Sequence, residues 1–321
     1  MRESLARFGT AGTALIFGSV AVWLLLLIVV PHLMLIDYAF HANPGAIDKG
    51  LAAEGWTLHS FRPLFDPSDA LAFNTFVRTV LTSAVITVLA LVVCYPIAYY
   101  LAKVCSAKWL NLFMLCLLVP YWVNEVLRAY AWRTLMARQG LLNQTATALG
   151  LSPIDFFNYE LPVLDANIAL FVGLVYSYIL FMVFPMFTAM ESLDTNQIEA
   201  ARDLGASWAR VHRKIVIPHA KPGIASGCIV TFMLCAGSYI VPVLLGGKSS
   251  FWFTQAIESQ FSVLNWNGGS AYALTLELVC LILVLVMMRA LRVTLRDIAR
   301  GADRHVSRRD GKAAFAGTVP E

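Results

Sequence analysis

Six long apolar blocks are the feature of this sequence that most restricts its fold. Because the hydrocarbon core of a bilayer is about 30 Å thick, a helix that crosses it needs roughly 20 apolar residues. The blocks that approach or exceed this length lie at residues 14–36, 73–101, 109–127, 167–190, 223–245 and 270–290. Hydrophobic residues make up 59% of the chain and charged residues only 14%, whereas a soluble domain has about 25% charged residues. We therefore expect an all-α polytopic membrane protein with six transmembrane helices.

The placement of lysine and arginine predicts the orientation of these helices. Basic residues gather before residue 14, at 102–108, at 191–222 and after residue 290. Cytoplasmic segments carry such an excess, so both termini are expected inside. The first block is too long for the apolar region of a signal peptide and is interpreted as an uncleaved span. We accordingly expect a cytoplasmic N-terminus (1–13), a transmembrane domain (14–295) and a polar cytoplasmic tail (296–321).

Several classes of protein fit the composition poorly. The net charge of +4 is small and follows the membrane orientation, so nucleic-acid binding is not expected. The six cysteines form no CxxC pair, and the histidines form no closely spaced pair, so neither a disulfide framework nor a metal site is expected. The outer loops 38–72 and 128–166 are longer than a turn requires and are predicted to contain short helices or interface structure. Trp122, Tyr130 and Trp132 suit the outer membrane interface.

The cytoplasmic loop 191–222 has a distinctive internal spacing. Asn196 is expected to cap a helix, with Glu199 reaching back to it. The alanines that follow Glu199, together with Leu204, are expected to sustain the helix and give it a small, flat face, and Gly205 can end the helix or admit a close partner backbone. Pro218 and Pro222 are expected to reset the chain as it enters the membrane again. Capping alone indicates only a stable loop helix, so the functional interpretation depends on the whole spacing.

That spacing runs Glu199-Ala200-Ala201, three residues, Gly205, nine residues, and then Ile215-x-Ile217-Pro218. It resembles the EAA motif of ABC importer permeases, written EAA-x3-G-x9-I-x-L-P, with Ile217 where leucine is usual. Further stretches resemble permeases of the spermidine/putrescine type. They lie at residues 120–133, 140–143, 239–247 and 265–270, and the resemblance covers residues 73–290.

The resemblance implies a type I ABC importer permease fold in the bacterial inner membrane. In that family the permease forms half of the translocation pathway and pairs with a second, homologous permease. Two copies of an ATPase subunit bind inside, and a periplasmic or extracellular binding protein delivers the small solute outside. The EAA helix docks on the ATPase, so a bulky residue at the motif glycine is expected to block coupling. The coupling residues implied are Glu199, Ala200, Ala201, Gly205, Ile215 and Pro218.

The chain itself is not expected to be an enzyme or to hold a cofactor. Gly247-Lys248-Ser249 ends like a phosphate loop, but the first glycine of that pattern is replaced by Pro242. ATP is therefore expected on the partner subunit, and no catalytic residue or metal ligand is predicted in this chain.

Ionisable side chains at membrane depth are candidates for solute contact because an uncompensated charge there is costly. Glu277 lies within the sixth block and Glu125 in the outer part of the third, where Arg128 at i+3 could instead pair with Glu125. A polyamine would also favour aromatic faces, which Tyr121, Trp122 and Tyr239 could supply.

The solute is predicted to be a polyamine. Within the same family an amino acid derivative, a phosphonate or an iron- or thiamine-type solute is the alternative. From other classes, a stand-alone secondary transporter or channel would need its own coupling-ion site. Neither that class nor a non-transporting scaffold would give the EAA spacing a role.

Overall fold

Membrane-length helices dominate the structure, a computed structural model that describes residues 2–41, 56–65, 70–158, 160–161, 166–247 and 250–291. The predicted tail at 296–321 and the Lys248–Ser249 pair lie outside these residues. In chain order the elements are α1 (Arg2–Leu24), η1 (Leu25–Val29), α2 (Val30–Phe40), η2 (His59–Phe61), α3 (Arg62–Phe65), α4 (Ala70–Tyr99), η4 (Tyr100–Val104), α5 (Ala107–Leu118), η5 (Val119–Trp122), α6 (Glu125–Met136), α7 (Leu141–Ala148), β1 (Glu160–Leu161), β2 (Ala166–Asn167), α8 (Ile168–Glu191), α9 (Thr195–Asp203), α10 (Trp208–Val211), η6 (His212–Val216), α11 (Ile217–Ala236), α12 (Ile240–Leu245), α13 (Phe253–Ser262) and α14 (Trp266–Leu291).

Five helices of the described residues are long and apolar enough to cross a membrane. They are Ala11–Phe40, Leu71–Val104, Ile168–Glu191, Trp208–Ala236 and Trp266–Leu291. A sixth candidate is a bent pair, Ala107–Trp122 and Glu125–Ala148, whose halves meet at 100°. The prediction of an all-α membrane protein is therefore confirmed, whereas the third apolar block is not one straight helix.

The break in the third block has a local cause. Pro120 lies in the short turn η5, and Asn124 then begins a new helix by accepting a hydrogen bond from the Val126 amide at 2.8 Å. A proline cannot donate to the helical ladder, and an asparagine cap satisfies the first free amides of the next helix. Chain direction therefore changes sharply between α5 and α6.

The fifth span begins and ends earlier than the apolar block at 223–245 predicts. Its helix runs without interruption over Trp208–Ala236, so the expectation that Pro218 and Pro222 reset the chain is wrong. The π-helical turn η6 ends at Val216, two residues before Pro218. This wider turn changes the hydrogen-bond pattern where the proline ring would otherwise crowd a carbonyl, so the helix continues.

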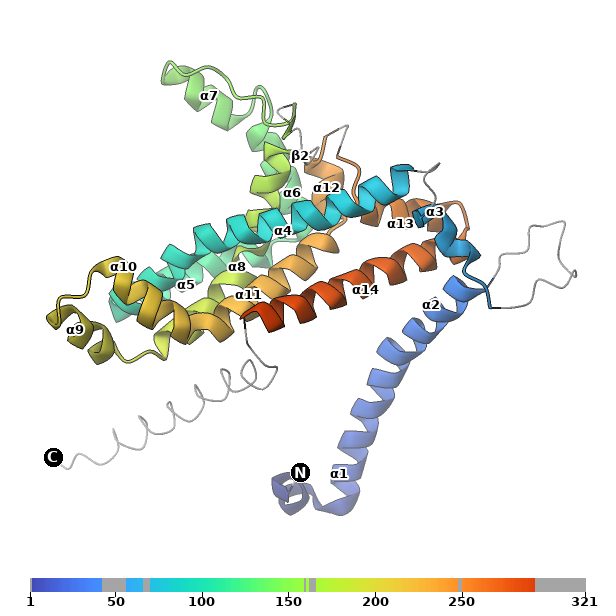
Figure 1. Cartoon of the computed structure of the whole chain (residues 1–321), viewed down its shortest axis with the longest axis horizontal. Coiled ribbons are helices and arrows are strands. Elements are labelled where there is room, and N and C mark those ends of the chain that lie inside the picture. The colour runs from blue at the N-terminus through green and yellow to red at the C-terminus, as the bar shows by residue number, and fades with distance from the viewer. Residues whose placement is uncertain are drawn as a thin grey trace, which may run out of the picture. The chain divides into compact units, whose positions relative to one another are not determined.

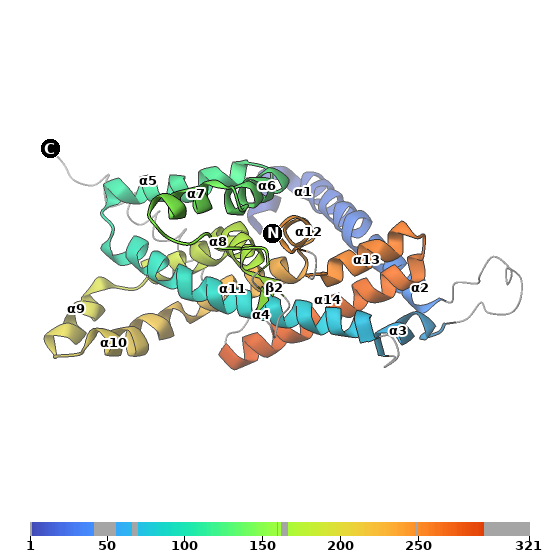
Figure 2. The same cartoon turned by 90° about the horizontal axis from the view of Figure 1, so that it is seen from above.

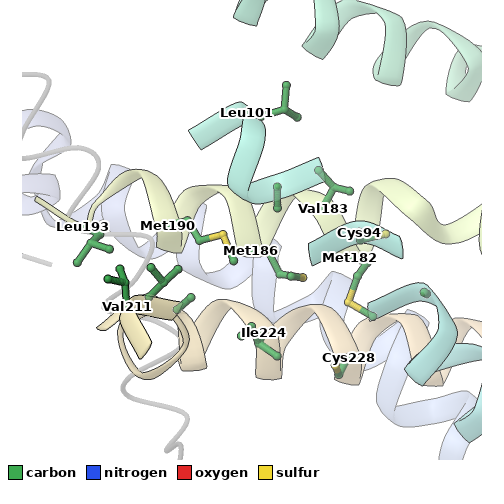
Figure 3. Packing of buried hydrophobic residues seen from close by; sticks show 14 of the residues in the cluster. Cys94, Leu101, Met182, Val183, Met186, Met190, Leu193, Val211, Ile224 and Cys228 are labelled. Atoms are coloured by element: carbon green, nitrogen blue, oxygen red, sulfur yellow. The ribbon is translucent and has the colours of Figure 1, made fainter. Parts of the chain in front are cut away.

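The chain divides into two compact units, each described by itself. One comprises Met1–Asn74 with Gln255–Leu278, and the other Thr75–Thr254 with Val279–Glu321. In the second unit, α8 and α11 lie side by side (Figure 1), and α9 and α10 lie together at one end of α11 (Figure 2). Figure 3 shows the core formed by α4, α8 and α11. Its buried side chains include Cys94, Leu101, Met182, Met186, Met190, Ile224 and Cys228.

Two glycines set the close approach of α11 to α8. A Cβ atom at Gly223 would overlap the Pro185 carbonyl oxygen and lie 2.5 Å from the Ala189 Cβ atom. One at Gly227 would lie 3.0 Å from the Met182 sulfur. Small residues four positions apart allow such backbone contact between membrane helices, where lipid provides no hydrophobic driving force for association. The glycine pair therefore makes α8 and α11 the central helix pair of this unit.

The predicted outer loop 128–166 does contain short structure. It holds the end of α6, the helix α7 and a two-stranded antiparallel ladder of β1 and β2. Asn143 ties α7 to the following chain, because its side chain exchanges hydrogen bonds with the Ile154 backbone at 3.0 and 2.8 Å. Hydrogen bonds from Asn158 hold the pKa of Asp155 below its usual value, and Arg138 lies 3.4 Å from the same carboxylate. In the other long loop, the described residues 59–65 form η2 and α3.

Candidate coupling surface and solute contacts

The motif loop is closed at its base by contacts between its two ends. The Ser192 hydroxyl lies 2.9 Å from Nε2 of His219, across the loop. The Lys103 ammonium donates to the carbonyl oxygens of Glu191 and Leu193 at the end of α8. Cations at a helix C-terminus satisfy its free carbonyls. The loop is thereby attached to both neighbouring spans.

Helix α9 begins two residues earlier than the sequence predicts. The Asp194 side chain, not that of Asn196, caps the helix by accepting from the Asn196 amide at 3.1 Å. The assignment of Asn196 as the cap is therefore wrong. Both residue types make good caps, and the extended backbone at Asp194 decides between them.

The motif glycine ends α9 in a left-handed conformation. Gly205 has a φ of 77°. The Gly205 amide donates to the Arg202 carbonyl at 2.8 Å, and the Ala206 amide donates to the Ala201 carbonyl at 3.0 Å. These two bonds form a Schellman motif, whose C′ position favours glycine because it has no Cβ atom. Nothing of this chain lies within 4 Å of a Cβ atom built at Gly205, so the space beside the turn is open.

The predicted coupling residues divide into an outward and an inward set. Glu199, Ala200, Gly205 and Pro218 are exposed. Ala201 and Ile215 are half-buried and pack against the core of α4, α8 and α11. The outward set faces away from the chain, whereas the inward pair attaches the loop to the spans.

Two apolar side chains beside the glycine turn are exposed, which the sequence did not predict. Leu204 is 90% exposed and Trp208 is 67% exposed. Large apolar side chains on an otherwise polar loop indicate an interaction surface. The signal in the sequence was their position on either side of Gly205, within a run rich in charged residues. We call Glu199, Ala200, Leu204, Gly205 and Trp208 the coupling surface.

An aromatic contact chain connects the coupling surface to α4. The rings of Trp208 and His212 lie with centroids 3.9 Å apart. His212 is buried, and its Nδ1 atom lies 2.6 Å from the Tyr95 hydroxyl of α4. The Tyr99 ring lies 4.4 Å from the same imidazole. Side-chain contacts thus join Trp208 to the second span.

A second group of polar and aromatic side chains lies at the break between α5 and α6. The Tyr121 hydroxyl donates to the Ser177 carbonyl at 2.6 Å and accepts from the Leu180 amide at 3.2 Å. Both partners belong to α8. The Arg128 guanidinium carbon lies 4.6 Å from the centroid of the Tyr121 ring, within the range of a cation–π contact.

Glu125 contacts a tyrosine of α8, not the arginine one turn along its own helix. Its Oε1 atom accepts from the Tyr178 hydroxyl at 3.4 Å. Among the described residues no ion pair joins Glu125 to Arg128, so the alternative that these two pair is wrong. Phe181 lies between the two tyrosines, with ring centroids 6.0 Å from Tyr121 and 6.5 Å from Tyr178. We call these five residues the Tyr121 cluster.

The remaining solute candidates lie elsewhere. Glu277 of α14 lies 3.4 Å from His32 of α2, and both side chains are about half exposed, at 51% and 53%. Trp122 is 83% exposed, so its ring is on the surface of the chain. Tyr239, 40% exposed, directly precedes α12, and α12 packs against α6. Solute contact by these three residues stays a prediction.

Membrane-length helices and a loop with the EAA spacing indicate a subunit of a membrane transporter. The chain belongs to the family described as binding-protein-dependent transport system inner membrane component, which matches residues 69–297. It is thus a multi-pass ABC importer permease, as the motif predicts.

Two relatives are spermidine/putrescine transport system permease proteins named PotB. That of Salmonella typhimurium strain SL1344 is 31% identical over 282 residues, covering 88% of this chain and 94% of the relative. That of Escherichia coli K12 is 32% identical over 272 residues, covering 84% and 94%.

One solved structure confirms the permease fold. It is a bacterial ABC transporter involved in the import of the acidic polysaccharide alginate, with a TM-score of 0.69 and 17% identity. The match covers 90% of this chain and 97% of the other. At this identity the likeness concerns the fold alone.

Proposed function

We propose that this chain forms half of the translocation pathway of an importer for polyamines or closely similar amino-containing solutes. The names of the PotB relatives, which align over most of both chains, support this solute class. The Tyr121 cluster supports it chemically, since a carboxylate and aromatic ring faces are groups that recognise ammonium ions. Glu277 remains a second candidate carboxylate.

The energy for transport comes, in this proposal, from a separate ATPase that docks on the coupling surface. The observation that carries the proposal is the open glycine turn of Gly205 between the exposed side chains of Leu204 and Trp208. Removal of such apolar side chains from water by a partner is favourable, so it would stabilise the docked complex. The contact chain through His212 then connects the docked ATPase to α4.

The complete transporter would hold this chain, a second homologous permease, two ATPase copies inside and a solute-binding protein outside. The basic residues support N-terminal and C-terminal ends in the cytoplasm, which puts the coupling surface on the ATPase side of the membrane. Residues 14–295 then form the membrane domain, with 191–222 as the coupling loop.

Reconstitution tests this function. The permease pair, ATPase and binding protein are inserted into liposomes that contain ATP, and uptake of labelled spermidine and putrescine is measured. Unlabelled polyamines are expected to compete, whereas amino acids and phosphonates are not. Liposomes without the ATPase serve as the control. ATP-independent uptake would instead support a secondary transporter or channel, and competition by phosphonates alone would contradict the polyamine assignment.

A further inference from the structure

The Tyr121 ring, in the short turn η5, is anchored to α8. Its hydroxyl is held by the Ser177 carbonyl and the Leu180 amide of α8, at 2.6 and 3.2 Å. Both bonds are made by the hydroxyl at the end of the side chain, so they do not use the ring itself. A tyrosine face attracts any cation placed above it, whether guanidinium or ammonium.

In this chain the cation on that face is the protein's own. The Arg128 guanidinium carbon lies 4.6 Å from the ring centroid. Its Nε and one Nη atom are buried and have no hydrogen-bond partner among the described residues. A buried cation normally acquires an acid or a carbonyl partner, because its desolvation is costly. Arg128 thus lies over the Tyr121 ring and interacts with that side chain, while two of its three nitrogen atoms have no partner among the described residues.

Glu125, the acidic residue of the same helix, contacts a tyrosine of α8 and does not pair with Arg128. Glu125 lies one turn before Arg128, yet it accepts a hydrogen bond from Tyr178 at 3.4 Å and makes no ion pair with Arg128 among the described residues. A carboxylate, a cation and an anchored ring therefore lie in one cluster without the expected ion pair. This arrangement leaves the carboxylate available to another cation.

We propose that Arg128 occupies the amine-binding face of Tyr121 in the solute-free chain, and that an ammonium group of the solute displaces it. The incoming ammonium would take the ring face and the Glu125 carboxylate, while the guanidinium moves aside. One cation then replaces another, so the exchange adds no net charge to the ring face. This inference rests on the proposed function, since it requires a solute that carries an amine.

The proposal predicts the direction in which Arg128 variants change affinity. Removal of a competing internal cation should tighten binding by about 2- to 30-fold, the range that corresponds to a cation–π contact of about 0.5 to 2 kcal/mol. Loss of a merely structural residue would weaken binding or leave it unchanged. A gain in affinity therefore distinguishes the two roles.

The experiment measures equilibrium binding of labelled spermidine to the purified transporter without its binding protein. Arg128→Gln is expected to tighten binding, and Arg128→Lys, which keeps a cation, is expected to stay near the wild-type value. Arg133→Gln is the matched control, because it removes the same charge from an exposed position on α6. In a Tyr121→Leu background, Arg128→Gln should give no gain.

Unchanged or weaker binding in Arg128→Gln, with the transporter intact by gel filtration, would overturn the proposal. The same assay is run with butylammonium, whose binding needs only an amine site. If wild-type transporter neither imports nor binds spermidine, the polyamine assignment fails. The role of Arg128 is then decided by whether Arg128→Gln tightens butylammonium binding.

Discussion

The turn at Gly205 allows backbone strain and partner contact to be separated by substitution. Its φ of 77° is unfavourable for a side chain with a Cβ atom, at a cost of about 1 to 2 kcal/mol. No atom of this chain lies within 4 Å of a Cβ atom built there. Strain alone should therefore weaken docking of the ATPase by at most about 5- to 30-fold. A larger loss requires a clash with the partner.

Substitution of Gly205 by asparagine or by alanine distinguishes backbone strain from contact with the ATPase, because the two explanations predict opposite orders of docking affinity. Asparagine adopts the left-handed region more readily than alanine does, but its side chain is larger. If the turn only needs the conformation, Gly205→Asn should dock better than Gly205→Ala. We expect the reverse, with Gly205→Asn and Gly205→Glu losing docking and uptake while the permease stays in the membrane.

The assay is affinity of the ATPase for detergent-solubilised permease, with uptake measured in parallel. Gly150 is the matched control, since its φ is also 77° and its Cβ position is also open, but it follows α7 in the predicted outer loop 128–166. Gly150→Asn and Gly150→Ala should leave docking unchanged. Near-normal docking of Gly205→Asn together with impaired Gly205→Ala would refute the contact explanation.

Three further perturbations follow from the packing. Gly223→Leu should lower the free energy of unfolding of the permease by about 1 to 3 kcal/mol, because its side chain must displace the α8 backbone. Gly18→Leu, at an open position, should leave the unfolding temperature unchanged. Tyr95→Phe removes the hydroxyl contact with His212. The number of solute molecules imported per ATP hydrolysed should therefore fall, while the ATPase still docks on the permease. An unchanged ratio would exclude a role of this contact in coupling. Glu277→Gln should lower the affinity or rate of spermidine uptake if this carboxylate contacts the solute, and unchanged values of both would leave it only as the partner of a histidine.

Much of the architecture could be predicted because it depends on local sequence. The length of an apolar block predicts a membrane helix when the whole helix surface faces lipid or other helices. The predicted blocks 167–190 and 270–290 are accordingly close to the observed helices Ile168–Glu191 and Trp266–Leu291. The spacing from Glu199 to Pro218 identified the family through a single loop. The same rules misplaced the ends of the fifth span, because hydropathy does not register a π-helical turn that lets a helix continue through Pro218.

The candidate site was predicted by residue type, but its pairing was not. The sequence offered Arg128 as the partner of Glu125, since residues three apart share a helix face. In the structure Glu125 contacts Tyr178, 53 positions away, and Arg128 lies on Tyr121. Leu204 was expected to sustain the loop helix, but its exposure was not predicted, because exposure depends on which face of a loop the rest of the chain covers.

The sequence by itself thus determined that the chain crosses a membrane, and that one loop carries the EAA spacing. Both features depend on lengths and spacings along the chain. Local sterics and hydropathy are sufficient to determine helices and turns from such patterns. Only the tertiary structure decided that Trp208 packs against a buried His212, whose ring also contacts Tyr95 of α4. That link joins residues 117 positions apart in sequence, and close packing of helices, which no local pattern encodes, brings them together.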